Sequence, residues 1–68
     1  MKNCIKLERV RNNLTQAELA EKVKVARQTI IAIESGRFVP SALLAFKIAN
    51  VLNCKTDILF ELEEKDWL

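Results

Sequence analysis

Residues 14–37 read LTQAELAEKVKVARQTIIAIESGR. The quartet TQAE near the start of this stretch has the composition of a capping box, so a helix is predicted to begin directly after Thr15. Residues 24–26 are expected to form a tight turn, and a second helix should fill the space between this turn and Gly36. Glycine ends the second helix because it adopts a positive φ readily. The stretch therefore predicts two short helices joined by a turn, with residues 16–35 as the unit.

The segment before this unit is also predicted to be helical. Apolar side chains recur at Ile5, Leu7 and Val10, and a helix over residues 3–12 would use them for apolar contacts. The pair Asn12-Asn13 is expected to end it, because asparagine tolerates the left-handed conformation at a helix C-terminus.

The C-terminal segment predicts two further helices and a strand-like tail. Ser41 is expected to cap a helix over residues 42–52 that ends at Asn53, and Thr56 to cap a short helix through the three residues after it. Residues 60–63 alternate apolar and acidic side chains, which is the period of a strand. The predicted fold class is all-α, with five helices in a single domain over residues 1–68. The chain ends can add a short β-ribbon to it.

The composition excludes several classes of protein. Half of the 68 residues are hydrophobic, with one glycine and one proline, which is typical of a small folded domain and not of a disordered chain. The absence of histidine and the wide separation of Cys4 from Cys54 argue against a metal site or a disulfide framework. We expect both cysteines to be buried free thiols, with a redox switch as the minor alternative. No pairing of a nucleophile with a base suggests an enzyme, and no cofactor is expected.

Charge is distributed unevenly along the chain. Residues 1–40 carry eight basic and four acidic side chains, a net charge of +4, whereas residues 41–68 carry three and five, a net charge of −2. A basic first half suits a surface that faces phosphate groups, although ordinary solvated surface would produce the same asymmetry. Neither a signal peptide nor an apolar run of membrane-spanning length is evident. A soluble cytoplasmic protein is therefore expected.

With these motifs in place, the chain resembles the phage-repressor and Cro-type helix-turn-helix family, the xenobiotic-response-element-like regulators of bacteria, archaea and phages. The matching residues span most of the chain and are Leu14-Thr15-Gln16, Glu18-Leu19-Ala20, Val25, Arg27-Gln28-Thr29-Ile30, Ile33-Glu34, Gly36-Arg37, Pro40-Ser41, Ile48-Ala49 and Asp57-Ile58-Leu59-Phe60. The resemblance implies a five-helix repressor-like domain. It also implies that the helix after the turn lies in the major groove of double-stranded DNA.

Carried over from the family, the base-contacting residues would be Arg27, Gln28 and Ala32. The chemistry agrees, since arginine can bind guanine O6 and N7, glutamine can bind adenine N6 and N7, and a methyl group can contact that of thymine. Ile31 would either rest against a thymine methyl group or sugar edge, or pack partly into the core.

The same resemblance implies that Gln16, Thr29 and Arg37 contact backbone phosphates. A helix N-terminus favours an anion near Gln16, while the alternative for Arg37 is an ordinary solvated charge. Family members also pair an arginine with a glutamate at the positions of Arg9 and Glu34. This pair would tie the first helix to the recognition helix and serve a structural role.

Two positions depart from the family pattern. Lys24 stands in the turn where glycine is usual, and a non-glycine residue in the left-handed region costs roughly 1 kcal/mol. Ala26 stands where serine or threonine usually caps the recognition helix, and the lost cap is worth about 1 kcal/mol.

A single unit of this size reads little DNA, so a homodimer that binds two half-sites is expected. The interface is predicted in the C-terminal region, residues 42–68, where the helix over 42–52 has a second apolar side. Similar small regulators dimerise through the fifth helix and add a β-ribbon that pairs the chain ends. The nominated interface residues are Leu43, Phe46, Val51, Leu59, Phe60, Leu62 and Trp67. The alternative is that Phe60 and Trp67 pack within one subunit.

The leading functional hypothesis is a transcriptional repressor that binds a palindromic operator, associated with the nucleoid of a prokaryote. The alternatives are an antitoxin or restriction-control autoregulator, and a protein-interaction adaptor of the same fold. Membrane association and a small-molecule ligand are not expected.

Overall fold

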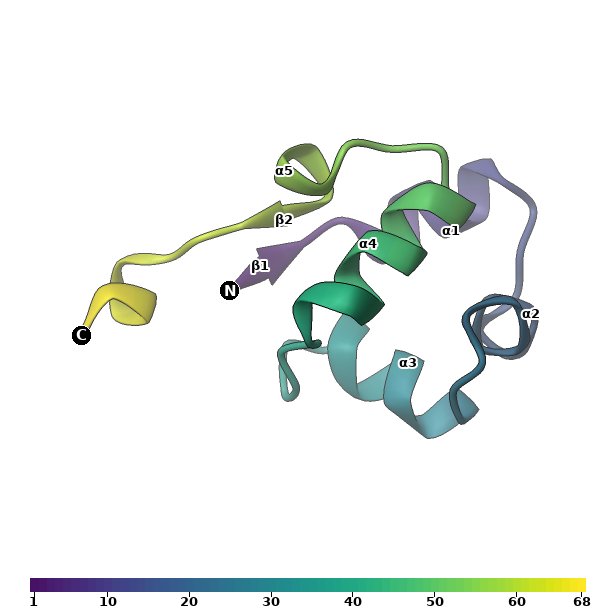
Figure 1. Ribbon diagram of the computed structural model, residues 1–68, viewed down its shortest axis with the longest axis horizontal. Helices are drawn as coiled ribbons and strands as arrows, with labels where there is room; N and C mark the ends of the chain where they lie inside the picture. Colours follow the sequence, from purple (N-terminus) through teal and green to yellow (C-terminus); the bar gives the residue numbers. More distant parts are fainter.

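The computed structural model describes residues 1–68 and confirms the predicted fold class (Figure 1). Its helices are α1 (Ile5–Arg11), α2 (Gln16–Val23), α3 (Arg27–Glu34), α4 (Ala42–Val51) and α5 (Thr56–Leu59). Two short strands, β1 (Lys2–Asn3) and β2 (Phe60–Glu61), form an antiparallel pair in which Lys2 lies opposite Glu61 and Asn3 opposite Phe60. A 3₁₀ helix, η1 (Glu64–Trp67), follows β2. No helix combines the length and apolar character that crossing a membrane requires.

One hydrophobic core joins all five helices. It consists of Ile5, Leu19, Ala20, Val23, Ile30, Ile33, Ile48, Ala49, Leu52, Leu59 and Phe60. Helix α4 crosses the middle of the molecule. The C-terminal segment projects from the end of the molecule that lies opposite α2 (Figure 1). The core thus fixes α2 and α3 against each other and against α4, while the tail projects from the body.

The predicted helix ends are confirmed at residues that adopt left-handed backbone. Asn13, Asn53 and Gly36 have φ angles of 56°, 54° and 81°. The predicted cap of α4 is also present, since Ser41 Oγ accepts a hydrogen bond from the Leu44 amide at 3.2 Å. These local signals were sufficient because each depends on residues within one helical turn.

The prediction for the start of the first helix is wrong by two residues. Asn3 lies in β1, and its Oδ1 accepts a hydrogen bond from the Ile5 amide at 3.2 Å. The Cys4 amide donates to the Leu59 carbonyl oxygen at 3.0 Å. Pairing with residues 59–60 therefore holds residues 2–4 extended, and α1 begins only at Ile5.

Leu7 and Val10 supply fewer core contacts than expected. Their exposed fractions are 55% and 59%, and Ile5 is the one fully buried residue of α1. The apolar pattern of α1 predicts its helical period correctly but does not show which face meets the core. Leu7 and Val10 instead form an apolar strip on the surface.

The C-terminal region differs from prediction in two details. Thr56 is the first residue of α5 and not its cap; Lys55 occupies the cap position and makes no side-chain capping bond. The predicted strand over 60–63 is limited to 60–61, because η1 begins at Glu64. The β-ribbon is present, and it pairs the two ends of one chain.

Both cysteines are free but only half-buried, whereas full burial was expected. The Cys4 thiol donates to the Ile58 carbonyl oxygen at 3.5 Å, and the Cys54 thiol to that of Lys55 at 3.6 Å. Burial raises the pKa of the Cys54 thiol, so this thiol is protonated at neutral pH.

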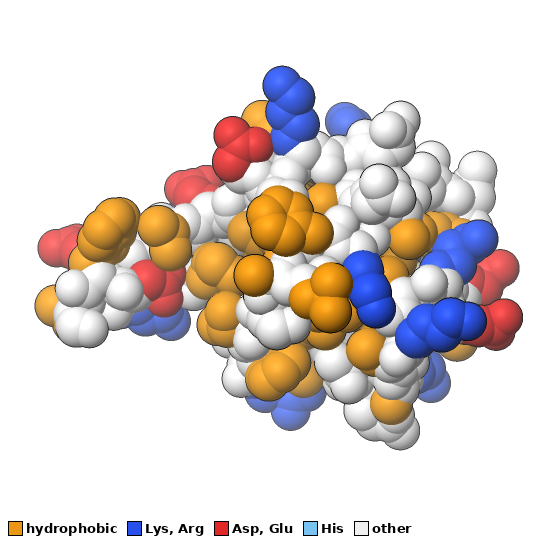
Figure 2. All heavy atoms as spheres, viewed as in Figure 1, with side chains coloured by type: hydrophobic (Ala, Val, Ile, Leu, Met, Phe, Trp, Pro, Cys, Tyr) orange, Lys and Arg blue, Asp and Glu red, His pale blue; other side chains and the backbone are white.

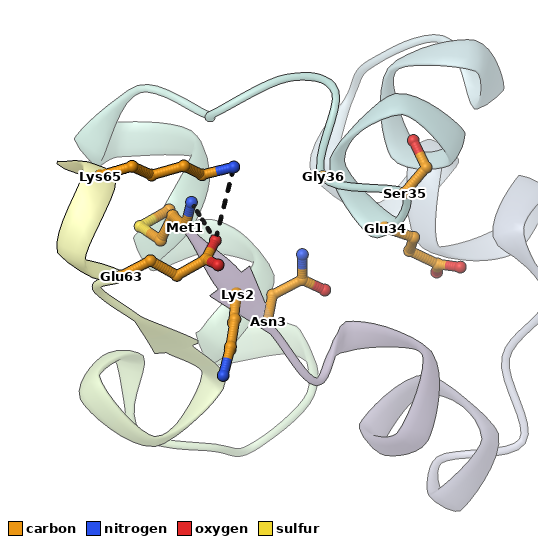
Figure 3. Close-up of a pocket in the computed structure, with 8 residues that line it drawn as sticks. All are labelled: Met1, Lys2, Asn3, Glu34, Ser35, Gly36, Glu63 and Lys65. Carbon is orange, nitrogen blue, oxygen red and sulfur yellow. Dashed lines mark ion pairs between the residues drawn. The ribbon is translucent and has the colours of Figure 1, made fainter.

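The tail is attached to the N-terminus by ion pairs. The Met1 ammonium lies 2.9 Å from Glu63 Oε1, as Figure 3 shows, and 3.1 Å from Asp66 Oδ2. The hydrogen bond with Glu63 is the main reason why the pKa of the ammonium is raised, and the same bond lowers the pKa of Glu63. A polar hollow of about 400 Å³ lies beside these groups and reaches Gly36 (Figure 3). The start and the end of the chain are therefore held together.

Lys24 is left-handed, with a φ of 65° and a ψ of 44°, as expected for the position where the family has glycine. Replacing it with glycine should remove the clash of Cβ with the backbone, so Lys24→Gly is expected to raise the free energy of unfolding by about 1 kcal/mol. Urea denaturation followed by circular dichroism measures this change. The matched control is Lys22→Gly, where the backbone is helical and the same replacement should cost about 1 kcal/mol. A loss of stability in both variants would contradict the strain at residue 24.

Candidate nucleic-acid interface

The start of α2 is fixed by a complete capping box. Thr15 Oγ1 accepts from the Glu18 amide at 3.0 Å, and Glu18 Oε1 accepts from the Thr15 amide at 2.9 Å. The bond from the Thr15 amide is the main reason why the pKa of the Glu18 carboxyl group is lowered. Gln16, the first residue of α2, is thereby held in a defined orientation at the helix N-terminus.

The start of α3 has no such cap. Ala26 occupies the cap position and has no hydroxyl group to accept a hydrogen bond, so no side chain covers the first amide groups of this helix. Ile30 and Ile33 are fully buried and pack α3 against the hydrophobic core, whereas Arg27 and Gln28 are exposed. The N-terminal end of α3 therefore presents donors that a ligand can reach.

A hollow of about 460 Å³ lies between the N-terminal ends of α2 and α3. Its walls are formed by Arg9, Thr15, Gln16, Ala17 and Arg27. Two arginines and an amide side chain border it, and it contains no acidic wall residue. Such a hollow suits an anion that hydrogen bonds to arginine and to helix N-terminal groups.

An ion pair lies beneath this hollow. Arg9 Nε donates to Glu34 Oε2 at 2.7 Å, and the two side chains are only 11% and 8% exposed. Arg9 also donates to the Leu14 carbonyl oxygen at 2.9 Å, and Gln16 Nε2 donates to Glu34 Oε1 at 3.2 Å. The expected pair is therefore present, and it belongs to a network that joins α1, the start of α2 and the end of α3.

The bond between Gln16 and Glu34 was not foreseen, because eighteen residues separate them and no local pattern links them. It occupies one of the two N–H groups of the Gln16 amide. The other N–H group remains available for a phosphate oxygen.

The remaining predicted contact residues lie along and beyond α3. Thr29, Ile31 and Ala32 are half-buried, so Ile31 shares its surface between the core and solvent. Arg37 is exposed in the loop after α3, and its Nε donates to Ser35 Oγ at 3.0 Å. Arg37 thus lies at the opposite end of α3 from Arg27.

A helix-turn-helix family model matches residues 5–59, which covers all five helices. This chain belongs to the Cro/C1-type helix-turn-helix family. The matched region includes α2, the turn and α3, where the uncapped helix and the hollow lie.

Several relatives carry the name uncharacterized HTH-type transcriptional regulator. One from Methanocaldococcus jannaschii is 50% identical, with 97% of this chain and 100% of the relative covered. One from Bacillus subtilis is 47% identical, again with 97% of this chain and 100% of the relative covered. One from Archaeoglobus fulgidus is 44% identical, with 97% of this chain and 93% of the relative covered. The family and these names are those of regulators and not of enzymes.

Within this helix-turn-helix domain, most of the nominated dimer residues lie on the surface. Leu43, Phe46, Leu62 and Trp67 are exposed, and Val51 is half-buried. Leu59 and Phe60 need correction: both belong to the core of the single chain, where Leu59 is completely buried and Phe60 is 9% exposed. Phe60 therefore packs within the subunit.

Sequence reasoning also missed surface-exposed apolar residues outside the nominated set. Ile58 on α5 is 64% exposed, and Leu7 and Val10 on α1 are exposed as well. The signal was present in the chain as apolar residues in amphipathic helices. Only the folded arrangement shows that these side chains face away from the core.

Removing Arg9 should be costly because it leaves the Glu34 carboxylate buried without its partner. Arg9→Ala is expected to lower the free energy of unfolding by about 3 kcal/mol, measured by urea denaturation. The matched control is Arg11→Ala, whose side chain is 67% exposed and lies 3.3 Å from Glu8 on the same helix. Its loss should cost at most about 0.5 kcal/mol. Equal effects of the two changes would show that the network is not structural.

Proposed function

We propose that this protein is a sequence-specific transcriptional regulator that binds double-stranded DNA, and that it represses transcription as a homodimer on a palindromic operator. The observation that carries this proposal is the uncapped start of α3, where Arg27 and Gln28 are exposed and Arg27 lines the hollow that Gln16 borders. The names of the relatives support the same class of function.

The recognition helix would read bases through its exposed N-terminal side chains. Arg27 and Gln28 have the donor and acceptor geometry for guanine and adenine edges in the major groove. Further along α3, Ala32 and the exposed part of Ile31 would contact thymine methyl groups. The buried Ile30 and Ile33 hold the helix rigid while it makes these contacts.

Phosphate contacts would fix the domain on the duplex. Gln16 has one free amide N–H at the start of α2, and Thr29 and Arg37 lie on and after α3. Contacts of this kind set the orientation of the protein and carry no sequence information.

A homodimer would double the recognition surface. Two copies of α3 would enter successive major grooves about 34 Å apart on one side of the duplex. The exposed residues Leu43, Phe46, Leu62 and Trp67, with the half-buried Val51, are the candidate contacts between subunits.

The two glutamines should behave differently when each is replaced. Gln28→Ala should lower discrimination at one base pair by roughly 1–3 kcal/mol, because a base contact is lost. Gln16→Ala should weaken binding to every sequence by about 1 kcal/mol, because a phosphate contact is lost. Competition binding with a panel of single-base operator variants measures both effects. The exposed Val10→Ala on α1, outside the candidate interface and the C-terminal region, serves as the control and should change neither. Equal effects of the two glutamine variants on every sequence would contradict these roles.

The operator itself can be found by selection from a random duplex library, followed by a salt titration on the enriched sequence. An enriched palindrome with half-site centres about ten base pairs apart is expected, together with an affinity that falls steeply as salt rises. The absence of any enriched sequence would overturn the proposal and favour the protein-interaction adaptor.

A further inference from the structure

An apolar groove with a basic rim lies between α2 and α4. It encloses about 480 Å³, and its apolar wall consists of Leu43, Phe46 and Val51. Its charged lining residues are Lys22, Lys24 and Lys47, and Asn50 completes the wall. With Leu43 and Phe46 exposed by 67% and 61%, the groove presents apolar surface surrounded by positive charge only. Its occupant should therefore be both apolar and acidic.

The chain itself carries a segment with this chemistry. The tail, residues 61–68, contains four acidic residues and one lysine, together with Leu62, Trp67 and Leu68. Leu62 and Trp67 are 56% and 76% exposed. Figure 2 shows hydrophobic side chains on the projecting tail beside acidic ones, and hydrophobic side chains over the body beside basic ones, on the same face.

Leu62, at the start of the tail, shares a hollow with Phe46 of its own chain, but the end of the tail lies far from the groove. The C-terminus and α2 lie at opposite ends of the long axis (Figure 1), and the molecule extends 34 Å along that axis against 21 and 19 Å across it. The ion pairs of Met1 with Glu63 and Asp66 hold the tail in this outward position. The end of the tail, with Trp67, therefore meets this groove on a second molecule.

We propose that the groove binds the tail of a second copy of this chain, and that two copies exchange tails reciprocally. The inference deepens the proposed homodimer and rests on it. Trp67 and Leu62 of one copy cover the apolar wall of the other, where burial of aromatic and aliphatic surface drives association. Glu61 and Glu64, the tail carboxylates that do not pair with Met1, face the lysines of the rim, which sets the register of the two chains.

The symmetry of this arrangement suits DNA binding. A two-fold axis perpendicular to the long axis of the molecule brings each tail to the groove of the other copy. The same rotation leaves α3 of both copies at one edge of the dimer (Figure 1). A stable interface buries about 800 Å² on each partner, which is about a sixth of the 4850 Å² surface of this chain.

The proposal is tested by reversing charges on each side of the contact. The groove variant is Lys22→Glu/Lys47→Glu, and the tail variant is Glu61→Lys/Glu64→Lys, which spares the carboxylates paired with Met1. Each variant alone should raise the dissociation constant of the dimer about tenfold, because like charges then meet in both contacts. An equimolar mixture should form heterodimers with an affinity close to that of the unchanged protein, since both contacts are again attractive. Sedimentation equilibrium measures the three constants.

The control variant Lys6→Glu reverses a charge on α1, outside both the groove and the tail, and should leave the constant unchanged. Thermal melting identifies any variant that fails to fold. The chain that carries all four groove and tail substitutions provides a second test. It should form a homodimer by itself, because its acidic groove meets a basic tail in both contacts. The emission of Trp67, the one tryptophan of the chain, should shift to shorter wavelength as the unchanged protein dimerises.

The outcomes separate this inference from the proposed function. A dimer that neither variant weakens, or whose formation leaves the emission of Trp67 unchanged, overturns tail exchange and leaves the homodimer in place. A protein that stays monomeric at every concentration overturns both the exchange and the homodimer. In that case, a binding measurement with the operator duplex decides separately whether the protein recognises DNA. An acidic peptide from another protein then becomes the candidate occupant of the groove.

Discussion

The ion pair between Arg9 and Glu34 is the interaction on which the candidate interface depends. It connects α1, the first turn of α2 and the last turn of α3. Apolar contacts are non-directional, whereas a nearly buried arginine with a short bond to a carboxylate accepts only one arrangement. Because Gln16 also bonds to Glu34, the orientation of a candidate phosphate contact is coupled to the position of the recognition helix.

The small size of the chain explains why so much apolar surface remains outside. Only 12 of the 68 residues are buried, and ten large hydrophobic residues are exposed. A chain of this length has too little interior to enclose half of its residues when half are hydrophobic. The exposed apolar residues are therefore a consequence of size, but their concentration on α4 and the tail is a property of this sequence. A partner that covers them adds to the stability of the fold as well as to function.

Sequence alone was sufficient for most features that depend on neighbouring residues, the expected cap at Thr56 being an exception. The capping box at Thr15, the cap at Ser41 and the left-handed residues Asn13 and Lys24 belong to this group. It was insufficient where distant residues compete, as at Asn3, which pairs with Phe60 and delays the start of α1. The identity of the candidate contact residues came from resemblance to a family. Their surroundings, such as the bond that holds Gln16, required the three-dimensional arrangement.

The distribution of charge links the two surfaces of the molecule. The start of α3 and the arginines of the hollow between α2 and α3 lie at one end of the molecule. The acidic tail projects from the other end (Figures 1 and 2). An acidic segment close to α3 would repel phosphate groups and weaken any binding to DNA. The ion pairs of Met1 with Glu63 and Asp66 hold the tail beside the C-terminal end of α3, where Glu63 shares a hollow with Ser35, and leave the N-terminal end of α3 clear of acidic tail residues. The lysine-rimmed groove offers the remaining charges of the tail a partner. Segregation of charge along the long axis thus allows one small domain to carry an acidic contact for protein and a basic surface for DNA without competition between them.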